Sequence, residues 1–202
     1  MKSMILAVLV LIAAAMPAAA TSTTYNWNFA TAPNQTLGTT SQTYGSSGVS
    51  IVATGSTNLY YKWEGTGEIG LGLTNTLDHE ITPGQSVTFN LNSLLGKNVT
   101  AISLTLDSMT HETGKACDNF GMCVTFTPSE NGKPVSILGL LTDMQKHDSG
   151  ELIITGSQGG ILVEDLQATI SSVPEPGSLF LIGSGLVTIA AVTRRKIRLV
   201  NR

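Results

Sequence analysis

Residues 98–107 read NVTAISLTLD, and their alternation decides the fold class. Ile102, Leu104 and Leu106 are apolar, whereas the residues between them are polar. Successive side chains of a β-strand point to opposite faces, so this period of two predicts a strand with one buried and one solvated face. Strands of this kind are typical of antiparallel sheets that cover a core on one side.

The same alternation recurs between residues 21 and 172. It is clean in 86–92, and further strands are predicted at 25–29, 49–54, 59–63, 69–73, 122–127, 151–155 and 161–170. Turn-forming residues separate these strands at 45–48, 82–84, 131–132 and 159–160. Many short strands with such breaks predict a single antiparallel β-sandwich that is jelly-roll-like in its connections.

Two segments depart from this pattern. Residues 136–144 have apolar side chains at helical spacing, but Gly139 lies inside the segment and Pro134 precedes it, so a strand and a short helix both fit. Residues 31–47 are rich in Ser, Thr, Asn, Gln and Gly, and they are predicted to be a loop or an irregular sheet edge.

Two of the predicted strands contain residues that are unusual in a strand, namely two glycines in one and an acid among apolar residues in the other. Gly70 and Gly72 alternate with apolar residues and leave one face of their strand free for close approach of another backbone. Glu164 falls in phase with the apolar residues of the last strand, so either a bulge re-aims it or it is buried and paired.

The N-terminus has the three parts of a secretory signal peptide. Lys2 supplies a positive charge, residues 4–15 are apolar, and Ala18 and Ala20 are the small residues that signal peptidase needs. Residues 1–20 are therefore predicted to be a leader of the Sec type that is cleaved after Ala20.

The C-terminus has a proline-rich motif, an apolar run and a basic cluster, in that order. The uncharged run 177–193 would reach about 25 Å as a helix, and flanking basic side chains can extend this to the headgroups of a bilayer. We expect a transmembrane helix whose basic end stays in the cytoplasm. The residues of this membrane stop are Arg194, Arg195, Lys196 and Arg198.

This composite resembles the PEP-CTERM sorting signal of Gram-negative bacteria. The resemblance rests on Val-Pro-Glu-Pro at 173–176, Gly-x-Gly at 183–185 and Arg-Arg-Lys at 194–196, within residues 173–202. It implies processing by exosortase, a membrane-embedded transpeptidase-like enzyme, and association with extracellular polysaccharide and biofilm matrix. The sorting motif that it implies is Val173, Pro174, Glu175 and Pro176.

The net charge of the domain at residues 21–172 argues against two classes of binding partner. The domain holds five lysines, no arginine and thirteen of the fourteen acids of the chain, an excess of eight negative charges with neutral histidine. Nucleic acids and anionic membrane surfaces are bound through Lys and Arg, so neither is expected as its partner.

Cys117 and Cys123 are the two cysteines of the chain. An exported protein meets an oxidising compartment, so a pair at this spacing predicts a disulfide that closes the tip of a hairpin. A zinc site that adds His111 and Glu112 is the alternative, although its spacing matches no common structural zinc site.

No motif in the sequence identifies an enzyme. His79, His111 and His147 each lie beside an acid on a predicted turn, and they would form a site only if the fold brought them together. No cofactor is expected; if calcium binds, the acids to consider are Asp78, Glu80, Glu164 and Asp165. A carboxylate pair for glycoside cleavage remains an alternative among the acids.

Tyr60, Tyr61 and Trp63 form the densest aromatic cluster, and aromatic rings stack on sugars in many polysaccharide-binding modules. Alternation places Tyr61 and Trp63 on one face, where we expect them in the core, and leaves Tyr60 exposed. Tyr60 and Trp63 are the sugar contacts to test.

The sequence thus predicts a non-enzymatic protein that is exported, anchored in the inner membrane as a precursor, and sorted by exosortase to the cell surface or extracellular matrix. Exopolysaccharide is the expected partner. A carbohydrate-binding module and a secreted polysaccharide hydrolase that use the same sorting route are the alternatives.

Overall fold

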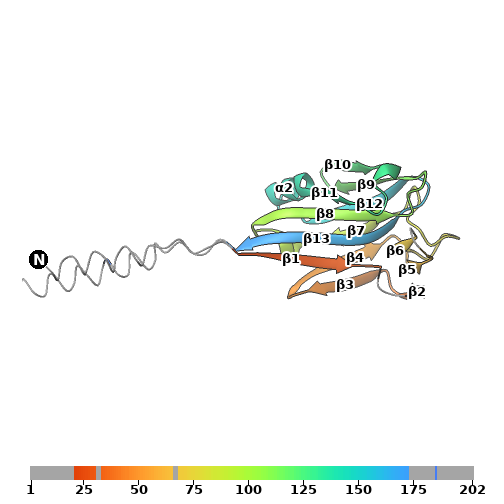
Figure 1. The fold of residues 1–202 in the computed structure, drawn as a ribbon, viewed down its shortest axis with the longest axis horizontal. Coiled ribbons are helices and arrows are strands. Elements are labelled where there is room, and N and C mark those ends of the chain that lie inside the picture. The colour runs from red at the N-terminus through yellow and green to blue at the C-terminus, as the bar shows by residue number, and fades with distance from the viewer. Residues whose placement is uncertain (1–20, 31–32, 66–67, 173–184, 186–202) are drawn as a thin grey trace, which may run out of the picture. The chain divides into compact units, whose positions relative to one another are not determined.

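The computed structural model describes residues 21–30, 33–65, 68–172 and 185. Two antiparallel sheets with little helix make up the described chain, which confirms the mostly β fold (Figure 1). Residues Thr23–Ile170 form one compact unit. The jelly-roll order of connections stays a prediction.

Seven strands form the first sheet, called sheet A. Their order from one edge is β11 (Pro134–Ser136), β8 (Val99–Asp107), β13 (Leu162–Ser172), β6 (Ile69–Leu73), β5 (Leu59–Trp63) and β2 (Gln35–Thr36), while β1 (Thr21–Asn28) also pairs with β13.

Six strands form the second sheet, called sheet B. Their order is β10 (Cys123–Phe126), β9 (Thr113–Asp118), β12 (Glu151–Gln158), β7 (Val87–Asn90), β4 (Val49–Gly55) and β3 (Ser41–Ser46).

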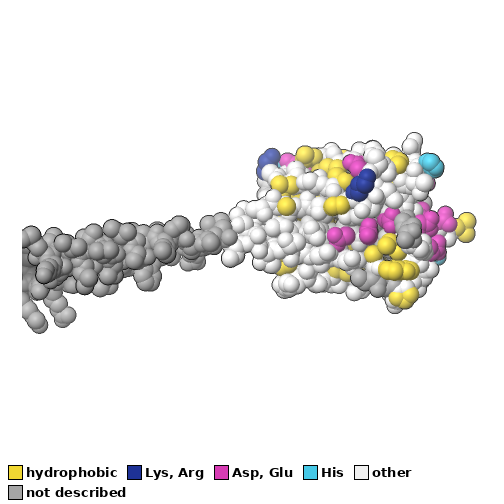
Figure 2. Space-filling view, viewed as in Figure 1, with side chains coloured by type: hydrophobic (Ala, Val, Ile, Leu, Met, Phe, Trp, Pro, Cys, Tyr) yellow, Lys and Arg dark blue, Asp and Glu magenta, His cyan; other side chains and the backbone are white. Residues whose placement is uncertain are grey.

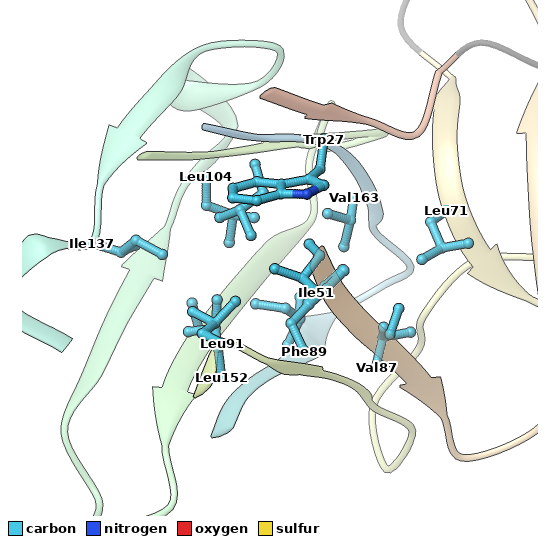
Figure 3. Close-up of a cluster of buried hydrophobic side chains, with 14 of the residues drawn as sticks. Trp27, Ile51, Leu71, Val87, Phe89, Leu91, Leu104, Ile137, Leu152 and Val163 are labelled. Atoms are coloured by element: carbon cyan, nitrogen blue, oxygen red, sulfur yellow. The ribbon is translucent and has the colours of Figure 1, made fainter. Parts of the chain in front are cut away.

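Side chains of both sheets meet in one hydrophobic core (Figure 3). Leu71, Leu104 and Val163 come from sheet A, and Phe89 and Leu152 come from sheet B; all five are fully buried. The alternation of residues 98–107 accounts for β8, in which Ile102, Leu104 and Leu106 face this core. Burial of apolar surface of this kind is the main favourable term in folding.

Between residues 21 and 172, the helical elements of the described chain are α2 (Leu138–Lys146) and the short 3-10 turns η1 (Asn92–Leu94) and η2 (Pro128–Glu130). The segment that fitted both a strand and a helix is therefore a helix. Leu140, Leu141 and Met144 lie at helical spacing and are buried, so burial of one face stabilises α2 despite Gly139.

The segment 31–47, predicted to be a loop or an irregular edge, contains β2 and all of β3, and each of these strands lies at the edge of its sheet. Strand β3 pairs with β4 over six residues but lies at the edge of sheet B, so only Tyr44 of its side chains packs against the core. An edge strand with one buried side chain carries little alternation, and its polar composition resembles that of a loop. Strands β9 and β11 were also not predicted.

Strand β1 lies antiparallel beside β13, so the two ends of the domain meet at one place. Thr21 and Ser172 share a side-chain hydrogen bond of 2.5 Å, and further along the pair Phe29 N donates to Glu164 O at 2.9 Å. The final strand therefore ends where the sequence begins its proline-rich motif.

Candidate functional site

Several predicted site residues lie outside the described residues. They are the sorting motif at 173–176, the membrane stop at 194–198, and the small residues Ala18 and Ala20. The same holds for the predicted span 177–193, apart from Gly185. Within the described part of the chain, no helix is long and apolar enough to span a bilayer.

The described domain has one prominent polar cluster, centred on Lys62 at the outer face of sheet A. Lys62 Nζ lies 3.1 Å from Glu80 Oε1, 3.0 Å from Glu68 Oε2 and 3.8 Å from Glu64 Oε2. Lys62 is only 3% exposed, and Glu80 is 9% exposed. A buried charge is stable only when it is paired and hydrogen-bonded, so the fold depends on these contacts.

The pKa of Lys62 reflects two opposing effects. Burial lowers it, but hydrogen bonds to Glu68 and Glu80 and the charges of both carboxylates outweigh burial, so the pKa lies above its ordinary value. Lys62 is therefore an ammonium ion at neutral pH and the counter-ion of these carboxylates.

Close backbone contacts bring Glu80 over Lys62. The segment between β6 and Ile81 folds back so that His79 O accepts from Leu73 N at 3.1 Å, and a side chain on Gly72 would collide with that carbonyl. A side chain on Gly160 would likewise collide with the Glu80 carboxylate. The predicted close approach at Gly72 is thus confirmed.

Backbone strain accompanies this arrangement. His79 and Ser108 adopt φ values of 57° and 66°, which residues other than glycine rarely adopt. Ser108 Oγ donates a short hydrogen bond to Glu80 Oε1, the same oxygen that Lys62 contacts. Strained residues persist only where surrounding contacts fix them. Here Ser108 bonds the Glu80 carboxylate, while His79, which precedes Glu80, is held by its stacking on Tyr60.

Three further acids extend the cluster along sheet A. Asp107 is buried and accepts hydrogen bonds from Ile69 N at 3.2 Å and Ser108 N at 2.8 Å. The pairing of β13 with β8 shifts register between Val163 and Asp165, so Glu164 lies in a β-bulge that changes the direction of its side chain. This is one of the two alternatives that the sequence predicted.

The carboxyl groups of Glu164 and Asp165 are less acidic than usual. Burial raises the pKa of Glu164, and the charges of Asp107 and Asp165 raise it further. Burial also raises the pKa of Asp165, against a smaller opposing effect of a backbone hydrogen bond from Leu166. On the face shown in Figure 2, most Asp and Glu side chains lie over the right half of the domain, with apolar side chains beside them.

The aromatic cluster is arranged differently from the prediction. Trp63 is 48% exposed at the end of β5, so its predicted place in the core is wrong. Tyr61 is partly buried and donates a hydrogen bond of 2.9 Å to Tyr44 OH. Tyr60 is partly buried rather than exposed, because it stacks on His79 with ring centroids 3.9 Å apart. Trp63 is the last residue of β5, where the strand ends.

The three histidines do not converge. His79 stacks on Tyr60, His147 stacks on Phe120 at 4.1 Å, and His111 is an exposed turn residue. Among the described residues, no group of three or more His, Cys, Asp or Glu side chains has the geometry of a metal site. Of the acids considered for calcium, Glu80 pairs with Lys62, while Glu164 lies near Asp107 and Asp165. Asp78 is exposed.

The predicted disulfide is confirmed, with an S–S distance of 2.05 Å between Cys117 and Cys123. Asp118 N donates to Met122 O at 3.0 Å, which closes the β9–β10 turn with a hydrogen-bonded pair. Cys117 and Cys123 face each other in the next, non-hydrogen-bonded pair, where antiparallel Cα atoms approach most closely. Their Cα atoms are 4.1 Å apart.

Sequence reasoning missed the role of Lys62. Its position between Tyr61 and Trp63 placed it on the outer face of β5, where lysine is ordinarily solvated. The signal that could have revealed its burial was Gly72, because a strand face left bare for backbone contact must be covered by another segment.

Comparison with known proteins identifies the C-terminal segment. The family model of the PEP-CTERM protein-sorting motif matches residues 172–196. No curated protein and no solved structure matches this chain. The motif implies an exported protein that exosortase processes and that passes through a membrane-anchored precursor.

Proposed function

We propose that this chain is a non-enzymatic surface protein whose β domain binds extracellular polysaccharide. It is exported by the Sec route, anchored in the inner membrane as a precursor, and processed by exosortase at residues 173–176. It is then delivered to the cell surface or the extracellular matrix. The sorting motif at 172–196 supports the delivery, and the exposed ring of Trp63 supports the binding.

Trp63 has the features of a sugar-stacking residue. Its ring is half-exposed, while its backbone is fixed by pairing with Ile69 and by a hydrogen bond of 2.6 Å from its N–H to Asn34 Oδ1. The side chains of Glu64 and Glu68 are also about half-exposed, and their oxygens can accept hydrogen bonds from sugar hydroxyls. A rigid aromatic surface with adjacent polar groups is a common basis of recognition.

Trp63 lies away from the last residues of β13. Strand β13 begins beside the acidic cluster and ends at Ser172, where the sorting motif starts. Asp165 and Ser172 are about 23 Å apart at 3.3 Å per residue of strand. Trp63 pairs with Ile69 at this level of sheet A, so within the domain it lies nearer the start of β13 than its end.

A binding assay with a matched control tests the domain. The exported protein is incubated with polysaccharide isolated from the producing cells, and co-sedimentation is compared for wild type, Trp63→Ala and Phe120→Ala. Phe120 is 46% exposed but lies on the β9–β10 turn. We expect at least a tenfold loss of affinity for Trp63→Ala alone. Equal binding by all three proteins would refute a role of Trp63.

Processing is tested by mass spectrometry of the mature C-terminus in cells with and without exosortase. We expect wild type to lose its C-terminal segment only when exosortase is present. Pro174→Ala should retain the segment, whereas Pro128→Ala, in η2, should be processed normally. Full-length wild type in exosortase-containing cells would contradict the proposed sorting.

A secreted polysaccharide hydrolase is the second candidate, and Glu164 favours it. A general acid needs a carboxyl group whose pKa is raised, and burial and neighbouring charges raise the pKa of Glu164. Release of reducing ends from the same polysaccharide, abolished by Glu164→Gln, would support this candidate. Binding without release of reducing ends would support the non-enzymatic role.

A further inference from the structure

Charge is distributed very unevenly along the domain. Residues 21–61 contain no Asp, Glu, Lys, Arg or His, and every charged residue of the domain lies between Lys62 and Asp165. The uncharged part forms β1 to β4 and most of β5. One side of the fold is therefore built from strands without charge, whereas the acids of sheet A lie on later strands.

Because of this charge distribution, edge strand β3 lacks the features that usually prevent pairing with strands of other molecules. Exposed edge strands are commonly kept short, or carry lysine or proline, because their unpaired backbone groups attract other strands. Strand β11 follows this rule, since it has three residues and begins at Pro134. Strand β3 does not follow it, because its six residues, Ser41–Ser46, include no charge and no proline.

The register of the β3–β4 hairpin shows which groups of β3 are free. Ser46 and Val49 flank a two-residue turn, so they form a hydrogen-bonded pair and alternate residues along β3 point their backbone groups away from β4. Thr43 and Gly45 point outward in this way. Within the described residues, neither N–H has a hydrogen-bond partner, and Thr43 O has only a 3.4 Å contact from Gln42 Nε2.

We infer that β3 is a self-association edge, at which a second copy of this chain adds its own β3 antiparallel to the first. A two-fold axis at Thr43 would place Thr43 opposite Thr43 of the partner subunit and extend sheet B across both copies. The domain carries an excess of eight negative charges, and contact through β3 keeps all charged side chains out of the interface.

The expected dimer is weak and reversible. Few backbone groups of β3 are free, because Thr39 Oγ1 already bonds both N and O of Ser41. Such an edge contact is smaller than a standard interface of about 1,600 Å². Association should therefore depend on concentration, and a high local concentration at a cell surface would favour it.

Two threonines on opposite edges of sheet B give a matched test. Thr125 on β10 is exposed like Thr43 and occupies an equivalent outward-pointing position opposite Lys115. The exported protein is compared by sedimentation velocity over a hundredfold concentration range as wild type, Thr43→Lys and Thr125→Lys. We expect the dimer fraction to rise with concentration in wild type and Thr125→Lys, while Thr43→Lys stays monomeric. Monomeric wild type, or unchanged dimerisation of Thr43→Lys, would overturn the inference.

A cross-linking experiment covers the case in which Thr43→Lys fails to fold. Thr43→Cys and Thr125→Cys are oxidised at a concentration where wild type is partly dimeric, and disulfide-linked dimers are quantified on non-reducing gels. We expect a several-fold higher yield for Thr43→Cys. Equal yields would show that β3 is not the contact. The result is independent of polysaccharide binding and of exosortase.

Discussion

Lys62 and Glu80 form a buried ion pair, with Nζ and Oε1 3.1 Å apart, that joins β5 to the segment folded over β6. Glu80 Oε1 also accepts from Ser108, so three separate parts of the chain meet at one oxygen atom. The stability of this end of sheet A therefore depends on a single lysine.

Replacing Lys62 should be strongly destabilising. Lys62→Met leaves the Glu80 carboxylate buried without its counter-ion, and removal of one partner of a buried pair costs about 3–5 kcal/mol. We expect a loss of this size in the free energy of unfolding, measured by urea denaturation. Lys115→Met is the matched control, since Lys115 is an exposed strand residue and should change stability by less than about 0.5 kcal/mol. A small effect of Lys62→Met would mean that water screens the pair.

Gly72 should not tolerate a side chain. In Gly72→Ala, the methyl group would overlap the His79 carbonyl, which belongs to the backbone and cannot rotate away. Overpacking of this kind costs about 1–3 kcal/mol, and we expect the upper end in thermal denaturation because the His79 to Leu73 hydrogen bond would also lengthen. Gly45→Ala, on β3, has open space around the new methyl group and should be nearly neutral. Equal melting temperatures of the two variants would exclude the close contact.

The disulfide should stabilise the domain modestly. It closes a short loop between residues six apart, for which the chain-entropy model gives about 2 kcal/mol. We expect a reductant to lower the melting temperature of wild type but not that of the double variant Cys117→Ser, Cys123→Ser. Equal effects of the reductant on both proteins would show that the bond is not formed in the purified protein.

Strands with a one-sided apolar pattern could be predicted from the sequence, whereas strands with small or polar residues could not. Strand β5 occupies 59–63 and β6 occupies 69–73, as predicted. Strand β9 was missed because its inward residues include Gly114 and Ala116, which carry almost no hydrophobic signal. Gly114 has no room for a side chain, because a Cβ there would come within 2.8 Å of Ile161 and 3.0 Å of Leu106.

Only part of the candidate site could be predicted from the sequence. Sequence alternation identifies the face on which a residue lies, but not what covers that face. The sequence predicted the bare surface at Gly72 and the two alternatives, bulge or burial, at Glu164, because each feature depends on one strand. The pairing of Lys62 with Glu80 depends on a segment folding back over sheet A. Alternation alone placed Trp63 in the core, although this residue is exposed at the end of β5.

Glu164 should make stability depend on pH. Its folded-state pKa is raised above the ordinary 4.5 by burial, then by Asp107 and Asp165, so the folded state binds this proton more tightly than the unfolded state. The stabilisation is fully present below pH 4.5 and is lost as the pH rises through the raised pKa. Glu164→Gln removes the charge and should raise the melting temperature relative to wild type at pH 7 but not at pH 4. The gain should stay below about 1 kcal/mol, because Glu164 is partly solvated.

Glu151→Gln, at an exposed position, controls for the general effect of removing one negative charge. If the two variants show the same difference from wild type at both pH values, the charges of Asp107 and Asp165 do not act on Glu164 and the bulge directs its carboxylate into solvent.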